Sequence, residues 1–210
     1  MQGDQKKTIN IEENPDLALM LAVELFRSGK VFIYPTDTIY GLGGNPLDDL
    51  VVKRINEIKG RDEKKHFIWL LSDIEKVLNY AEIVNENHLE FLQKIWPAPV
   101  TVILNLNERT KKVAKQETAA IRIPQNDFCL KLLKEISRPL ISTSVNRSGN
   151  DPINQIEKII NDFSQDVEAI FFSSQAQGNV YSTIIDLTSE QPKLIREGSI
   201  KFVELLQNFS

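Results

Sequence analysis

Short apolar runs alternate with amphipathic stretches along most of this chain, and this alternation constrains the fold more than any other feature. Runs such as VFIYP (31–35) and FIWLLS (67–72) have the length and composition of buried strands. Between them, Val51, Ile55 and Ile58 recur at helical spacing. Strands that alternate with helices predict an α/β protein in which helices cover a sheet.

Polar residues, prolines and glycines mark where several elements begin and end. Asn14-Pro15-Asp16 predicts the start of a helix that ends near Gly29. Asp48 or Asp49 can cap the next helix, and Gly60 can end it. Further strands are expected over residues 101–106, 119–124, 139–146, 169–173, 182–188 and 193–198, and further helices over 73–79, 86–95, 126–137 and 154–163.

Two connections between these elements refine the predicted fold. The polar, lysine-bearing segment between strands 101–106 and 119–124 is expected to be a loop. Because so little chain separates 182–188 from 193–198, these two strands should pair antiparallel, which makes the sheet mixed. The chain has no internal repeat and no Gly/Ser-rich linker, so we expect a single domain over residues 1–210.

The composition is that of an ordinary globular protein, with 41% apolar and 26% charged residues. No apolar run is long enough to cross a bilayer, and the first residues lack the apolar core of a secretory signal. A single cysteine, Cys129, excludes an intramolecular disulfide, so we expect a cytoplasmic location. The net charge of −4 argues against a dedicated nucleic-acid-binding protein.

Several common sites are excluded by the residues themselves. The chain has no P-loop motif, and GLGG (41–44) followed by Asn-Pro does not fit the dinucleotide-binding fingerprint. One cysteine and two histidines, His66 and His88, cannot build a cysteine-based zinc site. Cys129 lies among leucines on a predicted helix and is expected in the core, whereas His88 is expected on a helix surface.

The stretch PTDTIYGLGG (35–44) carries more hydroxyl groups and glycines than a connector needs. Its hydroxyl groups can bind a ligand, and its glycines are expected to let that ligand approach the backbone closely. Other polar groups lie at the ends of further elements, where ligands gather in α/β proteins. These groups are Lys59 and Arg61, the run Ser142 to Ser148, Arg122, Ser182-Thr183 and Arg196. Together they predict a pocket for a phosphorylated or carboxylated small molecule.

Each of these groups also has a structural explanation. Hydroxyl groups cap helices and form turns, and Arg122 could pair with an internal carboxylate. The basic residues between 53 and 66 form either an anion site or a solvated helix face, and charge alone favours the solvated face.

Seven motifs, in order along the chain, resemble those of the YrdC-like threonylcarbamoyl-AMP synthases in their short, single-domain form. The motifs are PTDTIYGLGG, IKGR, WPAPVTVIL, AAIRIP, STSVNRSGN, STIIDLT and LIREG. They cover roughly residues 15–200. The resemblance implies a twisted mixed parallel and antiparallel sheet with flanking helices around a concave groove.

The same resemblance implies a reaction. The family joins L-threonine, bicarbonate or CO2, and ATP into threonylcarbamoyl-adenylate and pyrophosphate, which makes its members nucleotidyltransferases. The product goes to tRNA threonylcarbamoyl-transfer proteins, which modify adenosine 37 of tRNA. ATP is therefore expected as a substrate and Mg²⁺ with it, whereas no tightly bound cofactor and no protein ligand to a metal are expected. Direct tRNA binding is expected to be weak.

Matched motif by motif, the resemblance assigns roles to individual residues. It implies catalytic roles for Lys59, Arg61, Ser144 and Asn146. These roles predict that Lys59→Met and Arg61→Met each lose turnover with an almost unchanged melting temperature. It implies that threonine is bound by Thr38, Arg122 and Ser182, and ATP by Arg61, Thr101, Ser144 and Arg196.

The chain also departs from the family pattern. Asp62, Ala98, Val145 and Glu197 stand where the family has proline, glycine, alanine and proline. These changes affect local loop geometry more than the chemistry. Leu70 stands where the family has a histidine that contacts threonine, and His66 is the nearest residue that could replace it.

Two other functions fit part of the pattern. The first is an RNA-binding module for double-stranded RNA or tRNA without catalysis, which the acidic balance and the lack of an aromatic stacking motif disfavour. The second is a carbamoyl-transfer domain of the kind found in hydrogenase-maturation proteins, which would require zinc-finger cysteines that this chain lacks.

Overall fold

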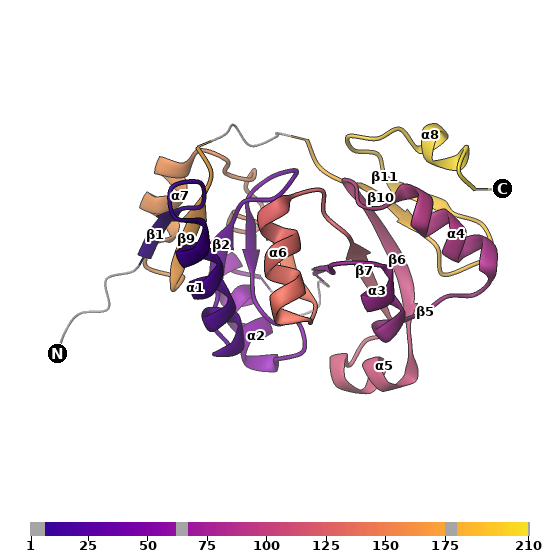
Figure 1. Ribbon diagram of the computed structural model, residues 1–210, viewed down its shortest axis with the longest axis horizontal. Coiled ribbons are helices and arrows are strands. Elements are labelled where there is room, and N and C mark those ends of the chain that lie inside the picture. Colours follow the sequence, from indigo (N-terminus) through magenta and orange to yellow (C-terminus); the bar gives the residue numbers. More distant parts are fainter. Residues whose placement is uncertain (1–6, 62–66, 175–179, 210) are drawn as a thin grey trace.

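The computed structural model describes residues 7–61, 67–174 and 180–209, which form one mixed β-sheet with helices on both faces (Figure 1). Within these residues the strands run in the order β1-β9-β2-β3-β8-β4-β7-β6-β10-β11, and β5 pairs with β6. The strands are β1 (Lys7–Asn10), β2 (Phe32–Tyr34), β3 (Gly41–Gly43), β4 (Ile68–Leu70), β5 (Ala81–Glu82), β6 (Val100–Leu106), β7 (Thr118–Arg122), β8 (Leu140–Ser144), β9 (Ala169–Phe172), β10 (Thr183–Asp186) and β11 (Lys193–Arg196). Parallel and antiparallel pairs both occur, so the predicted mixed α/β fold is confirmed.

Different helices pack against the two faces of the sheet. They are α1 (Pro15–Arg27), α2 (Asp49–Lys59), α3 (Ile74–Tyr80), α4 (Glu86–Ile95), α5 (Glu108–Ala114), α6 (Asp127–Ile136), α7 (Ile156–Phe163) and α8 (Phe202–Leu206). Alternate residues of a strand point to opposite faces, and in β2 this sends Phe32 and Tyr34 toward α1 and α6, and Ile33 toward α2 and α7. A third cluster packs α3 and α4 against β6 and β7 in the other half of the sheet (Figure 1).

The predicted ends of helix α2 and the predicted hairpin of β10 and β11 are both observed. The Asp48 side chain accepts the backbone N–H of Leu50 at 2.9 Å and that of Val51 at 3.4 Å. Gly60 ends the helix with a φ of 62°, which is the left-handed conformation that glycine adopts easily. The short connection between β10 and β11 gives the antiparallel pair that was expected.

Three features differ from the prediction. The polar segment after β6 contains helix α5 rather than a loop, because Asn107 caps it by accepting the N–H of Thr110 at 2.9 Å. At the start of α1, Asn14 holds the cap position but its side chain makes no cap hydrogen bond. Strand β1, which the sequence reading omitted, pairs parallel with β9.

The prediction that His88 lies on a helix surface was wrong. Its side chain is 1% exposed, and its Nε2 lies 3.0 Å from the carbonyl oxygen of Glu190. Its ring also lies 5.8 Å from the ring of Phe209. Both partners are more than 100 residues away in sequence, so the residues around 88 could not indicate this burial.

Gly43 and Gly44 have a packing role that was not expected from the sequence. A Cβ atom on Gly43 would lie 2.5 Å from the carbonyl oxygen of Ile141 and from the ring of Tyr34. A Cβ atom on Gly44 would lie 2.5 Å from the side chain of Val51. These two glycines therefore permit close packing of β3 and the following residue within the protein.

Candidate active site

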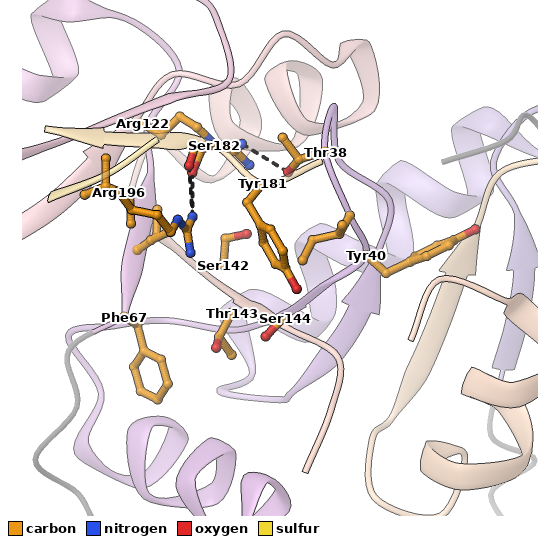
Figure 2. Close-up of a pocket in the computed structure, with 13 residues that line it drawn as sticks. Thr38, Tyr40, Phe67, Arg122, Ser142, Thr143, Ser144, Tyr181, Ser182 and Arg196 are labelled. Carbon is orange, nitrogen blue, oxygen red and sulfur yellow. Dashed lines mark hydrogen bonds between the residues drawn. The ribbon is translucent and has the colours of Figure 1, made fainter. Parts of the chain in front are cut away.

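A cavity of about 260 Å³ lies between the loop after β2, strand β8 and the start of β10 (Figure 2). Its polar lining consists of hydroxyl groups from Thr38, Ser142, Thr143, Ser144 and Ser182, and guanidinium groups from Arg122 and Arg196. None of the described residues that line it is acidic. Such a lining suits a negatively charged ligand of small size.

The hydrogen bonds around Thr38 determine whether its hydroxyl group donates or accepts a hydrogen bond. Arg122 Nη1 donates to Thr38 Oγ1 at 3.1 Å. Thr36 Oγ1 donates to the carbonyl oxygen of Ile39 at 2.7 Å and lies 3.0 Å from Thr38 Oγ1. Since the hydroxyl hydrogen of Thr36 is used on Ile39, the hydrogen of Thr38 must go to Thr36. Thr38 Oγ1 can therefore only accept a hydrogen bond from a ligand.

Arg122 is a buried cation with a buried partner. Its Nη2 lies 3.5 Å from Asp37 Oδ1, and the two side chains are 4% and 7% exposed. Asp37 Oδ2 accepts the backbone N–H of Gln125 at 3.2 Å, which ties the carboxylate to the chain after β7. Asp37 is thus the internal carboxylate that the sequence left open, and it offsets the cost of burying the guanidinium beside the cavity.

Ser182 faces the cavity with its hydroxyl hydrogen available. Thr101 Oγ1 donates to Ser182 Oγ at 2.9 Å, and Arg196 Nη2 donates to the Ser182 carbonyl oxygen at 2.9 Å. Ser182 therefore receives hydrogen bonds from behind and can donate its own to a ligand. Thr101, which was expected to contact ATP, is 0% exposed and lies behind Ser182 instead of lining the cavity.

Lys59 is buried and holds the turn after β8. Its Nζ donates to the Ser144 carbonyl at 2.6 Å, the Asn146 carbonyl at 3.2 Å and Asn146 Oδ1 at 2.8 Å. Ser144 Oγ also donates to Asn146 Oδ1 at 2.7 Å. Burial, with the charge of Arg61 nearby, lowers the pKa of Lys59 to about 8. The solvated helix face is therefore the wrong description of Lys59, which is 3% exposed.

Arg61 lies beside an aromatic wall of the cavity. Its guanidinium carbon is 4.5 Å from the centre of the Phe67 ring, and its Nε donates to Asn56 Oδ1 at 3.0 Å. Phe67 lines the cavity, whereas Arg61 and Lys59 stand outside its lining. Of the residues expected to be catalytic, only Ser144 is part of the lining itself.

Leu70, which stands where the family has a histidine, does not contact the cavity. It is fully buried in the cluster beneath α1 and α6. Asp62 and His66 lie outside the described residues. No histidine is among the described residues that line the cavity.

Sequence reasoning missed Tyr181, which lines the cavity and is 39% exposed. Arg196 lies against its ring, with the guanidinium carbon 5.0 Å from the ring centre. The signal was available, because Tyr181 directly precedes the Ser182-Thr183 pair that was singled out.

The described side chains do not fit a metal ion held by the protein alone. Over residues 7–61, 67–174 and 180–209, no group of three or more His, Cys, Asp or Glu side chains could hold one. In the same parts of the chain, no helix has the length and apolar character needed to cross a membrane.

A family model described as "Telomere recombination", which covers Sua5, YciO and YrdC proteins, matches residues 24–198. The chain belongs to the Sua5/YciO/YrdC family. This membership confirms the resemblance carried by the seven motifs. The threonylcarbamoyl-AMP synthase of Pyrococcus abyssi is 32% identical over 200 residues, which are 94% of this chain and 59% of that protein.

Solved structures of Sua5/YciO/YrdC proteins share the fold. A crystal structure of P. abyssi Sua5 complexed with L-threonine matches 96% of this chain with a TM-score of 0.85 and 31% identity. This chain spans 60% of that protein. E. coli YciO matches with a TM-score of 0.83 and 24% identity, covering 97% of this chain and 98% of its own. The chain thus spans about three fifths of its P. abyssi relatives and nearly all of YciO.

Proposed function

We propose that this protein is an L-threonylcarbamoyladenylate synthase, which joins L-threonine, bicarbonate or CO2, and ATP and releases pyrophosphate. The observation that carries the proposal is the cavity in which two guanidinium groups meet a set of hydroxyl groups. The P. abyssi relative is named threonylcarbamoyl-AMP synthase, and a structure of P. abyssi Sua5 is complexed with L-threonine. The proposal includes one domain over residues 1–210, a cytoplasmic location, and tRNA threonylcarbamoyl-transfer proteins as users of the product.

The hydrogen-bond directions around the cavity suit an α-amino acid. Arg122 and the Ser182 hydroxyl are donors, which a carboxylate accepts. Thr38 Oγ1 can only accept, which suits the amine or the hydroxyl group of threonine. The three residues assigned to threonine thus offer complementary groups in one cavity.

The proposed reaction has two bond-forming steps. The neutral amine of threonine attacks the carbon of CO2 and loses a proton, which gives a carbamate. A carbamate oxygen then attacks the α-phosphorus of ATP, and the bond from that phosphorus to the pyrophosphate oxygen breaks. The carbamate is labile in water, so a site that excludes water favours the second step.

Negative charge builds on the phosphoryl oxygens and on the leaving group during the second step, and preorganised donors stabilise it. Arg196 and Ser144 line the cavity, and Arg61 stands behind its Phe67 wall. We assign these three residues to the phosphates, which requires the Ser144 hydroxyl to turn its hydrogen from Asn146 Oδ1 to a phosphate oxygen. Mg²⁺ is expected to arrive with the phosphates of ATP.

Lys59 and Thr101 act through other residues in this account. Lys59 Nζ makes three hydrogen bonds to Ser144 and Asn146, so its role is to hold the turn that carries the Ser144 hydroxyl. Thr101 orients the Ser182 hydroxyl in the same way.

The test is pyrophosphate release by the purified protein with ATP and Mg²⁺. Release is expected only when threonine and bicarbonate are both present, and equal release without threonine would contradict the proposal. Serine should be used about 10-fold to 200-fold less well, because it lacks one methyl contact.

A further inference from the structure

Tyr181 is the aromatic side chain of the cavity lining that keeps a substantial exposed surface. It is 39% exposed, whereas Phe67 is 6% exposed and Tyr40 is 2% exposed. In Figure 2 its ring points from the Ser182 side of the cavity toward Thr143 and Ser144. A large aromatic surface at the opening of a polar cavity is available to a ligand.

Backbone contacts hold Tyr181 in place, so the point from which its side chain projects is fixed. Its carbonyl oxygen accepts the N–H of Ser199 at 2.9 Å. Gly198 packs so closely that a Cβ atom there would lie 2.2 Å from the same oxygen. On the other side, Thr183 N donates to the Pro99 carbonyl at 3.0 Å.

Arg196 lies over one face of the Tyr181 ring. Its guanidinium carbon lies 5.0 Å from the ring centre, and its Nη2 is fixed by the bond to the Ser182 carbonyl. Burial lowers the pKa of Arg196 from its ordinary value, which still leaves the guanidinium charged at neutral pH. The result is an aromatic ring next to a fixed cation, with ring surface left open.

We propose that Tyr181 binds the adenine ring of ATP by stacking, an inference that rests on the proposed function. Of the three proposed substrates, only ATP has an aromatic ring that can stack on an exposed aromatic side chain. Stacking of a base on an aromatic side chain tolerates any base, and a guanidinium beside the ring can add a cation–π contact to it. The phosphates would then lie toward Arg196 and Ser144, which line the same cavity.

The experiment compares ATP with inorganic tripolyphosphate, which keeps the phosphates but has no base. Binding of each is measured by titration calorimetry for the wild type, Tyr181→Ala, Tyr181→Phe and Val180→Ala. Val180 is the matched control, because it is 51% exposed beside Tyr181 and does not line the cavity. Thermal melting of each variant checks that it is folded.

Tyr181→Ala is expected to weaken ATP binding by about 10-fold to 100-fold and to leave tripolyphosphate binding unchanged. Tyr181→Phe and Val180→Ala should bind ATP as the wild type does. Equal losses for both ligands, an unchanged ATP affinity in Tyr181→Ala, or a wild type that binds ATP no better than tripolyphosphate would overturn the inference. No threonine is present, so this result is independent of threonine-dependent pyrophosphate release, which tests the proposed function.

Discussion

Lys59 illustrates what a residue's neighbours in sequence cannot reveal. The basic run around it favoured a solvated helix end, yet its ammonium is buried on a turn that lies 85 residues further along the chain. Arg122 and Asp37 are separated similarly and meet as a buried pair. In both cases the residue type indicated a function, and only the fold identified the partner.

Lys59→Met should lower both stability and turnover. The substitution removes the donor to three part-buried acceptors, of which Asn146 Oδ1 keeps its bond from Ser144 Oγ, so we expect a loss of about 1–3 kcal/mol in the free energy of unfolding. Turnover should fall by about 100-fold or more, because the turn that carries Ser144 is no longer held. This revises the expectation of an almost unchanged melting temperature.

Arg61→Met is the matched control for that variant, since Arg61 is only partly buried. We expect it to lose turnover with a change of less than about 1 kcal/mol in unfolding free energy. Denaturant unfolding and pyrophosphate release measure the two effects. Equal stability of the Lys59→Met protein and the wild type would show that Lys59 does not hold the turn.

Cys129 should be unreactive in the folded protein. It is 0% exposed, its Sγ donates to the Pro35 carbonyl at 3.3 Å, and burial raises the pKa of its thiol far above the ordinary value. A disulfide reagent monitored by absorbance should therefore detect the thiol only after unfolding in guanidinium chloride. Rapid reaction of the native protein at pH 8 would mean that this part of the core opens readily.

Helices and strands were predictable where they carry their own pattern. The helices α1, α2, α4 and α6 show apolar spacing and polar or glycine ends, and most strands are apolar runs. Helix α5 has few apolar residues, so its cap at Asn107 was its main local signal. Strand β3 consists of Gly-Leu-Gly, and it forms because β2 and β8 pair with it on either side.

Gly43→Ala tests the packing role of the glycines in β3. The added methyl group would meet the Ile141 carbonyl and the Tyr34 ring at 2.5 Å, so stability should fall by about 1–3 kcal/mol. Gly60→Ala is the comparison, because nothing lies within 4 Å of its added methyl group and only its φ of 62° is unfavourable. We expect it to cost about 1–2 kcal/mol.

Chemical denaturation measures both glycine variants. If the glycines served ligand approach instead, Gly43→Ala would keep its stability and lose affinity for threonine.

The charge of the protein as a whole bears on the RNA-binding alternative. The net charge is −4, and the structure places Lys59 inside the protein, where it is 3% exposed. Exposed basic surface is therefore reduced further relative to the sequence pattern. An enzyme acting on small molecules fits this balance better than a nucleic-acid-binding module.

Binding of tRNA should accordingly be weak and sensitive to salt. Few phosphates can be neutralised by such a surface, so affinity should fall steeply between about 50 and 200 mM salt. Fluorescence anisotropy with labelled tRNA at several salt concentrations measures this. Tight binding that persists at high salt would favour the RNA-binding module.

The central claim is that the cavity converts threonine, bicarbonate and ATP into an adenylate. Its most direct test is mass spectrometry of the small molecules after incubation of the protein with ATP, Mg²⁺, threonine and ¹³C-labelled bicarbonate. We expect threonylcarbamoyl-adenylate that carries the labelled carbon, with far less of it from an Arg122→Gln variant that is still folded. Consumption of ATP without any labelled adenylate, or the same yield from Arg122→Gln as from the wild type, would contradict it.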